Sequence, residues 1–499
     1  MEFLFGEMDM ERLAGRATVQ ATVEGALPLP GGRRSADTEL MCYEGGVTVS
    51  RATASEGTVT VEGRVRAELI CRGPAEENGG GELFSFASGA AFRYSAAVPG
   101  AKEGMPAQAR ARLVALELRQ GVELTLEALL ELECAAFEAK PMRTLAGVKG
   151  CPVEFAELPL SSLIEKDVGA GVVTLREELE LPGTPGRILH ARGACALREA
   201  AVNADCAALE GQLFINVLYQ SETGPMSAAA QFPFQMETPL DDRPNGECFA
   251  VAEVEAVEAR LLDGMDGVAT VQARVGAVTR CYEARAASVP ADAYLPGAAM
   301  ASTRANAAFL RRGRSVSVRH AVSETIPLPE GLPAPAGAVC CSVRPLITAA
   351  SATDGIACVE GILFLRGVCS TPAGELFTFP AEIPFLCETP CGDGFDRAWA
   401  EATCLSATLS VQNAAVTLHC ALLVEAEPWL VVETPVVTGM EERELPPARK
   451  AMVLYYAARE ETLFDVGKRF SLPREAIARA NPDAREQLLE GQPLLFLAK

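Results

Sequence analysis

The sequence of 499 residues contains a long internal repeat. Three segments match one another: each contains a Val/Leu-Glu-Gly motif, ending at Gly63, Gly211 or Gly361, and a largely apolar run follows each of these glycines. The three glycines are separated by 148 and 150 positions. Solenoid repeats have periods of about 20–50 residues, so this spacing indicates tandem copies of a whole domain.

Three further landmarks keep one order in every copy: a proline step, a phenylalanine-containing strand pattern and a closing alternating run. They are Pro30, Pro182 and Pro329, then Phe92, Phe234 and Phe385, then the runs 122–137, 268–282 and 416–427. We therefore predict domains at 1–157, 158–298 and 299–440, a linker at 441–450 and a terminal domain at 451–499. The first copy is the divergent one, because Gly79, Gly80 and Gly81 lengthen one of its loops.

Each copy has the pattern of an antiparallel β domain. Residues 211–219 alternate apolar and polar side chains with a period of two, and turn clusters such as 181–186 and 391–394 separate such runs. Short alternating strands between tight turns predict antiparallel sandwiches or half-open barrels, and we expect three sandwich-like domains. Residues 107–118 and 250–262 fit a helix or a strand, and we expect a strand for the second. The fold class is thus mainly β, with a small α+β domain at the end.

Charge and terminal composition restrict the function further. The chain has 44 Lys and Arg against 66 Asp and Glu, a net charge of −22, which argues against nucleic-acid binding. Residues 450–499 contain eight basic and seven acidic residues, so the acidity lies in the body. The N-terminus is acidic and no apolar run is long enough to span a membrane. We expect a cytosolic protein.

The sequence contains no clear reactive centre. Its 16 cysteines are scattered through strand patterns and are expected to be small buried residues, not a disulfide framework. The pairs Cys340/Cys341 and Cys387/Cys391 are the only clusters. Three distant histidines provide no metal-ligand spacing, and no phosphate-binding loop or nucleophile elbow occurs. We expect no catalytic residue, metal or cofactor, and a hydrolase remains a minor third hypothesis.

The last fifty residues have the pattern strand, helix, helix, strand. Residues 452–456 form an apolar run, and Thr462 is positioned to cap a helix. Pro473 starts a second helix that Asn481-Pro482 ends, and a turn at Gly491 leads into a final strand. The order predicts a βααβ domain.

These residues resemble a LysM domain, in 462–463, 468–470, 477–482 and 489–494. The resemblance implies a recognition loop and groove, with N-acetylglucosamine-containing glycans as the usual ligand. The loop of that family usually reads Gly-Asp-Thr, whereas here it reads Glu-Glu-Thr. The candidate recognition residues are Glu460, Glu461, Thr462, Leu463, Phe464, Asn481 and Pro482.

Tandem acidic β domains followed by one LysM domain resemble the SipL type of spore-coat assembly protein, whose repeated domains are of the SPOCS (spore coat) type. The resemblance implies a non-enzymatic scaffold in the mother-cell cytosol, on the outer surface of the forespore. It implies that the LysM domain meets the morphogenetic ATPase of the coat basement layer, and that other coat proteins are recruited. The alternative is a peptidoglycan-binding protein that acts through the LysM domain.

Several side chains allow two interpretations from the sequence alone. Trp399 and Trp429 are the only tryptophans, and either pack inside the protein or anchor a partner. Phe464 either points outward to a partner or packs in the core. Asn481-Pro482 either only stops a helix or also forms part of the groove.

Overall fold

The computed structural model describes residues 1–74, 81–138, 140–203, 205–241, 247–442 and 451–498. The chain is mainly β, and every strand pairing in these ranges is antiparallel. Gly79, Gly80 and most of the predicted linker lie outside the described residues. The prediction of a mainly β chain built from antiparallel sheets is confirmed.

The body consists of three two-sheet units. In the first unit, the sheet β3-β4-β5 packs on β2-β7-β6; in the second, β10-β11-β12 packs on β13-β14-β9; in the third, β17-β18-β19 faces β20, β21 and β16. A separate apolar core fills the space between the sheets of each unit. In the third unit a single pair, Ser351 with Arg397, also joins the two sheets at one edge.

The bounds of the unit strands follow the repeat. The strands are β2 (Leu13–Leu27), β3 (Glu39–Ser55), β4 (Thr58–Arg72), β5 (Leu83–Ala97), β6 (Ala107–Gln120), β7 (Leu124–Phe137), β9 (Glu154–Glu180), β10 (Pro185–Val202), β11 (Cys206–Ser221), β12 (Gly224–Pro239), β13 (Glu247–Leu261), β14 (Val268–Tyr294), β16 (Val316–Ile326), β17 (Gly337–Thr353), β18 (Ile356–Ser370), β19 (Leu376–Pro390), β20 (Arg397–Gln412) and β21 (Ala415–Glu442). Residues 107–118 and 250–261 are strand, which settles the two ambiguous segments.

The repeated glycine and phenylalanine of the sequence pair directly across two strands. Gly63 lies opposite Phe92, Gly211 opposite Phe234 and Gly361 opposite Phe385. A Cβ atom added to each glycine would lie 2.4–2.6 Å from the phenylalanine ring. The ring therefore covers the glycine backbone, an arrangement that pins the register of neighbouring strands. In each unit a bulge follows on the other side of the glycine, within β3, β10 and β17.

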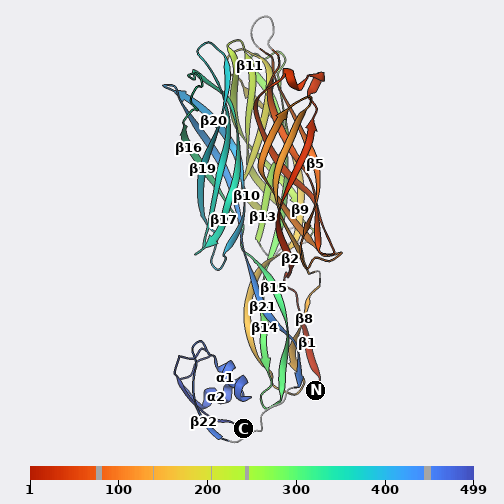
Figure 1. The fold of residues 1–499 in the computed structure, drawn as a ribbon, viewed down its shortest axis with the longest axis vertical. Coiled ribbons are helices and arrows are strands. Elements are labelled where there is room, and N and C mark those ends of the chain that lie inside the picture. The colour runs from red at the N-terminus through yellow and green to blue at the C-terminus, as the bar shows by residue number, and fades with distance from the viewer. Residues whose placement is uncertain (75–80, 139, 204, 242–246, 443–450, 499) are drawn as a thin grey trace.

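Below the units, three pairs of strands form a narrow stem (Figure 1). The pairs are β1 (Phe3–Met8) with β8 (Met142–Val148), the first half of β9 with the second half of β14, and β15 (Met300–Arg312) with the second half of β21. Each pair flanks one unit in sequence, so every unit continues into its own arm of the stem. Two apolar clusters contain side chains from all three arms and hold them together.

The stem corrects one expectation. The sequence predicts a linker at 441–450, which begins with Glu441 and Glu442. In the structure these two residues are the end of β21, which pairs with β15 as far as Glu442. Pro435 is tolerated because prolines fit strands at positions that need no ladder donor.

The three units close into a ring around a common axis. Strand β10 contacts β5 of the first unit, β17 contacts β12 of the second, and β3 contacts β19 of the third. These strands occupy equivalent places in the repeat, so the same kind of contact recurs three times. The body therefore has approximate threefold symmetry within one chain.

The chain ends in strand β22 (Ala451–Tyr456), helices α1 (Leu463–Phe470) and α2 (Arg474–Ala480), and strand β23 (Pro493–Ala498). The two strands pair with each other, and one face of this sheet packs on the helices. The predicted order of strand, helix, helix and strand is present. We call residues 451–498 the terminal module.

Candidate functional site

The axis between the three units begins with an apolar layer. Met41, Leu189 and Val339 belong to one cluster and are separated by the repeat spacing of 148 and 150 residues. The same cluster holds the equivalent residues Ile70, Leu218 and Val368. Each unit thus contributes the same two positions to a common apolar contact. This layer removes apolar surface of all three units from water, which favours their association.

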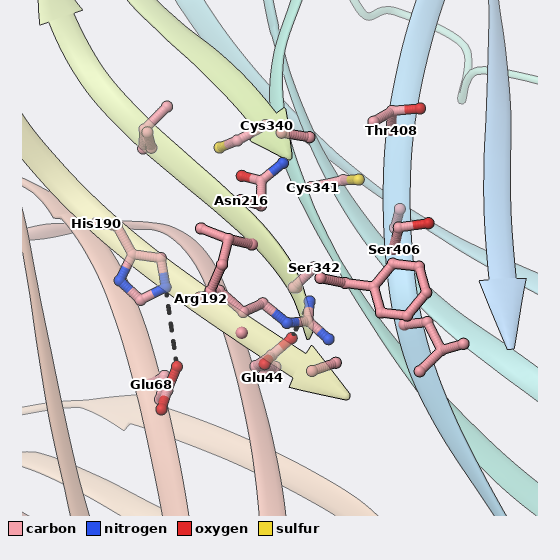
Figure 2. Close-up of a pocket in the computed structure, with 18 of the residues that line it drawn as sticks. Glu44, Glu68, His190, Arg192, Asn216, Cys340, Cys341, Ser342, Ser406 and Thr408 are labelled. Carbon is pink, nitrogen blue, oxygen red and sulfur yellow. Dashed lines mark ion pairs between the residues drawn. The ribbon is translucent and has the colours of Figure 1, made fainter. Parts of the chain in front are cut away.

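Next to this layer lies a polar cluster, also at equivalent positions. Glu44, Arg192 and Ser342 are related by the repeat spacing and come from β3, β10 and β17. Arg192 Nη1 lies 2.7 Å from Glu44 Oε2, and Figure 2 shows the two side chains turned toward each other. Ser342 Oγ donates a hydrogen bond of 2.8 Å to the carbonyl oxygen of Tyr43. All three side chains therefore connect different units.

Burial shapes the charges in this polar cluster. Burial alone would lower the pKa of Arg192, but Glu44 and smaller contributions from neighbouring groups together outweigh it, so the net shift is upward and the guanidinium stays charged. Burial lowers the pKa of His190, with Arg192 and Arg66 adding to the effect and Glu68 opposing it. His190 Nε2 lies 3.8 Å from Glu68 Oε2 (Figure 2). This contact strengthens only when His190 takes up a proton.

Other bonds join the units around the axis. Arg366 Nη2 of the third unit donates to the Tyr43 hydroxyl of the first at 2.9 Å, and the guanidinium also lies over that ring. Ser85 Oγ of the first unit donates to the carbonyl of Leu189 in the second at 2.6 Å. The boundary between the second and third units is apolar instead, built around Phe214, Leu405 and Leu423.

Two hollows lie along the axis. The smaller has a volume of about 130 Å³ and is lined by Glu44, His190, Arg192, Asn216 and Ser342 among others. The larger has a volume of about 1030 Å³ and extends between the units toward Trp399. A hollow of the smaller size has room for a few water molecules, and its polar lining groups are the ones that can hydrogen-bond them. Among the described residues, no group of three His, Cys, Asp or Glu side chains has the geometry of a metal site.

The thiols are mainly core residues, as the sequence suggested, with one exception. Cys248 and Cys281 face each other on β13 and β14 and form a disulfide. The expectation that the cysteines are unpaired is wrong for these two, because register places them directly opposite each other. Cys404 Sγ and Cys420 Sγ lie 3.7 Å apart as thiols. Cys387 and Cys391 are buried in the core of the third unit.

The adjacent pair Cys340 and Cys341 lies at the axis. The neighbouring thiol of Cys42 and burial raise the pKa of Cys340, and burial raises the pKa of Cys341. Both groups therefore remain protonated thiols at neutral pH, which makes them poor nucleophiles and poor metal ligands. In this setting they act as small packing residues.

Trp399 and Trp429 lie where the units meet the stem. Their rings stack with centroids 4.7 Å apart, and Trp429 is buried. Arg312 is only 7% exposed, lies over Trp399, and pairs with Glu11 and Glu427 at 2.9 and 2.8 Å. The structure therefore favours packing of the two tryptophans inside the protein over a role as an anchor for a partner.

The predicted recognition loop is largely used within the terminal module. Glu461 is buried, and its carboxylate accepts hydrogen bonds of 2.9 Å from the Tyr455 hydroxyl and the Ala458 amide. Thr462 caps α1, with its hydroxyl accepting from the Asp465 amide at 3.2 Å. Leu463 is buried in the core. Of the three loop residues 460–462, only Glu460 is exposed to solvent, and its backbone φ is 62°.

Asn481 and Pro482 lie at the other end of the module's helices. The Asn481 side chain donates to the carbonyl of Leu495 at 3.1 Å and accepts from its amide at 2.8 Å, which ties the end of α2 to β23. Pro482 is exposed. The backbone of residues 461–463 is instead hydrogen-bonded to residues 486–488. The loop and the Asn481-Pro482 part of the predicted groove are therefore anchored to different segments.

Phe464 packs against the stem and does not point outward. Its ring meets Tyr294 of β14 edge to face, with centroids 5.1 Å apart, and is buried. The Tyr294 hydroxyl donates to the carbonyl of Leu472 at 2.9 Å. This contact requires glycine at position 467, because a Cβ atom there would lie 2.2 Å from the Tyr294 hydroxyl oxygen.

Two ion pairs complete the docking of the module on the stem. Lys468 pairs with Asp292, and Arg474 Nε lies 2.7 Å from Glu154 Oε2. Burial raises the pKa of Asp292, but hydrogen bonds from Lys468 and Ser302 outweigh burial and give a net lowering. The helices of the module therefore face the stem and hold it by charged, polar and aromatic contacts.

The sequence patterns did not single out the polar axial residues Glu44, Arg192 and Ser342. They also did not single out the stem residues Asp292 and Tyr294, on which the module docks. The sequence does contain a signal for these axial residues, because the repeat spacing relates Glu44, Arg192 and Ser342. Polar residues of different kinds at one repeated position suggest contacts between the copies. No local pattern marks Asp292 or Tyr294, because their partners lie more than 170 residues away in sequence.

Comparison with known proteins finds no matching family model, no similar curated protein and no similar solved structure. In the part of the chain that the structure describes, none of the helices is both long and apolar enough to cross a membrane.

Proposed function

We propose that this protein is a non-enzymatic scaffold whose three units act as one rigid body and whose terminal module binds a partner. The observation that carries the proposal is the bonding across unit boundaries at repeat-equivalent positions. Glu44, Arg192 and Ser342 are each engaged with another unit, so these polar side chains serve cohesion. A scaffold needs this property, because its binding surfaces must keep fixed relative positions.

The terminal module supports the LysM part of the proposal through its order of elements. Strand, two helices and strand occur in sequence, and Thr462 forms the cap of α1 through a reciprocal contact with Asp465. The loop position where the LysM family usually has glycine is Glu460, whose φ of 62° is a conformation that favours glycine. The local backbone thus agrees with the resemblance even where the residue differs.

The proposed setting follows the resemblance to SPOCS–LysM proteins. The scaffold would gather on the forespore surface in the mother-cell cytosol and bind the morphogenetic ATPase of the coat basement layer. Binding through one module on a body with several surfaces raises the effective concentration of every recruited protein. Glu461, Leu463 and Phe464 would then act indirectly, by holding the module's shape.

Capture of the full-length chain tests this proposal against glycan binding. Immobilised basement-layer ATPase and insoluble peptidoglycan are offered in parallel, with the chain at equal concentration. We expect retention on the ATPase and negligible retention on peptidoglycan. Glu460→Ala and Pro482→Ala alter two exposed residues of the predicted recognition region without removing a buried contact.

Retention on peptidoglycan that these two substitutions abolish would favour the glycan-binding alternative. Retention on neither material would contradict the proposed tether. Arg479→Ala is a matched control, because Arg479 is an exposed residue on α2 that pairs with Glu475 on the same helix.

A further inference from the structure

The outer face of the two-stranded sheet in the terminal module is apolar and uncovered. Met452 is 71% exposed, Leu454 57% and Tyr456 61% on β22, and Leu495 is 46% and Leu497 68% exposed on β23. Exposed large apolar residues are ordinary when they are scattered, but a contiguous group marks an interaction surface. We call these five residues the outer sheet face.

The five side chains are contiguous because they form cross-strand pairs. Met452 lies opposite Leu497, and Leu454 lies opposite Leu495. Tyr456 lies opposite Pro493 at the end of the sheet. Alternate residues point the other way into the module, where Leu494 and Phe496 are buried against the helices. The sheet is therefore apolar on both faces, as strands are when both faces are covered.

The module's own fold leaves this face free. Helices α1 and α2 cover the inner face and dock on the stem, through Phe464, Lys468 and Arg474. Figure 1 shows the helices between the stem and β22, so the sheet lies on the side of the module away from the body. Nothing in the described part of the chain covers the outer sheet face.

The size of the face suits a pair of identical surfaces. The exposed fractions of its side chains correspond to roughly 600 Å² of apolar surface, at the upper end for a typical monomer. Two copies in contact would bury about 1,200 Å² in total, the lower end for a stable specific interface. Two-stranded sheets also pack well face to face, about 10 Å apart.

The charge distribution also favours a second copy. The outer sheet face has no charged residue, so a charged partner would find no complement on it. Residues 450–499 carry eight basic and seven acidic residues, whereas the rest of the chain is strongly acidic. Contact through the modules keeps the two acidic bodies at opposite ends, where salt screens their repulsion.

The geometry points to the outer sheet face as the self-association surface of this protein, in which two copies pack their terminal sheets face to face. The contact is isologous, with each residue of the face meeting the same face of the other copy about a twofold axis. Two bodies and two stems would then extend in opposite directions from a four-stranded centre. This inference concerns the chain alone and does not depend on the proposed coat partner.

Sedimentation velocity of the full-length chain over a wide concentration range tests the inference. We expect a reversible dimer for the unmodified chain. Leu454→Asp places an unpaired charge at the centre of the interface and should weaken the dimer by at least about a hundredfold. Leu497→Asp is a second variant and should act in the same direction.

Leu386→Asp is the matched control, since Leu386 is a strand residue of the third unit with a similar exposure of 53%. It should leave the dimer unchanged, and circular dichroism checks that each variant keeps its β content. A monomeric unmodified chain, or a dimer that survives Leu454→Asp and Leu497→Asp, would overturn the inference. So would a monomer whose capture by the ATPase depends on Leu454, because the face would then serve a different partner.

Discussion

The axis of the body and the outer sheet face of the terminal module distribute polar and apolar side chains in opposite ways. At the axis, charged and hydroxyl side chains are buried or half-buried between units and contact groups of other units, as in the ion pair of Arg192 with Glu44. On the module, Met452 and Leu454 are exposed to solvent. Burial of polar groups is costly unless they are paired, so the axis is specialised for cohesion. Exposure of apolar groups is costly unless a partner covers them, so the sheet is specialised for association.

The largest effect is expected for Arg192→Leu. The substitution leaves the partly buried carboxylate of Glu44 between units without its cation, which should lower the free energy of unfolding by about 2–3 kcal/mol, less than for a fully buried pair. Chemical denaturation of the full chain measures the change. Replacing both residues, as Glu44→Leu with Arg192→Leu, should recover most of the loss, because no charge then stays buried. Equal losses for the single and double variants would show that packing, not the ion pair, dominates here.

A smaller effect of the opposite sign is expected at Glu425, which lines the larger axial hollow. Burial, with a contribution from Glu401, raises the pKa of Glu425 from 4.5 to about 7. The folded protein therefore holds a proton that the unfolded chain has lost, and stability falls as pH rises from 4.5 to 7. Glu425→Gln should remove this fall and stabilise the protein at pH 8 by about 1–2 kcal/mol.

Unfolding curves at pH 4 and pH 8 check the sign of that effect. The variant and the unmodified chain should be equally stable at pH 4, where the carboxyl is protonated in both states. Glu388→Gln, on strand β19 outside the lining of the hollow, is the control. A benefit of Glu425→Gln that is the same at both pH values would contradict the role of burial.

The terminal module should respond to Glu460→Gly. Glu460 has a φ of 62°, where a residue with a side chain is strained and glycine is not. The change should stabilise the module by about 0.5–1 kcal/mol, since glycine's greater freedom in the unfolded chain offsets part of the gain. Hydrogen exchange of α1 and α2 amides reports this local stability. Slower exchange is the expected result, and faster exchange would show that the Glu460 side chain contributes a contact.

The smallest change in folding stability is expected for Leu454→Asp, measured at a concentration where the chain is monomeric. Leu454 is on the exposed side of β22, so its substitution should change the free energy of unfolding by at most about 0.5 kcal/mol. The two substitutions then separate two roles, because Arg192 stabilises the fold whereas Leu454 serves association. A large loss of stability would place Leu454 within the folding core of the module.

The repeat predicted the strands of the body well, because its landmarks are set by local sheet geometry. Gly63, Gly211 and Gly361 are spaced by the repeat, and each one lies under a phenylalanine ring on the next strand. A glycine before an alternating run suggests a close approach from sequence alone. The alternating runs likewise identified the last strand of every unit.

The stem could not be predicted, because its strands continue from the units without a break in pattern. Strand β9 has 27 residues and β21 has 28, and each pairs within a unit at one end and within the stem at the other. Alternation specifies a strand but not which sheet it joins. For the same reason the linker predicted at 441–450 begins too early: Glu441 and Glu442 are paired strand in the structure.

The candidate site was predicted only in part. The cap at Thr462 follows from a local motif, and the structure contains it. The burial of Phe464 depends on Tyr294, a residue far away in sequence that packs on it only because the module docks on the stem. The outer sheet face had a signal in sequence, since residues 452–456 are apolar on both sides of the strand. Contacts between distant elements, not local propensity, determine the rest.

Hydrogen exchange of the full-length chain carrying Arg192→Leu tests most directly whether the axis makes three units into one body. Strands β3, β10 and β17 each line this axis, and only β10 carries the substitution. The cohesion described above predicts faster exchange of amides in all three strands, relative to the unmodified chain. Faster exchange confined to β10 and its own unit would contradict it, because the units would then be independent domains that merely lie side by side.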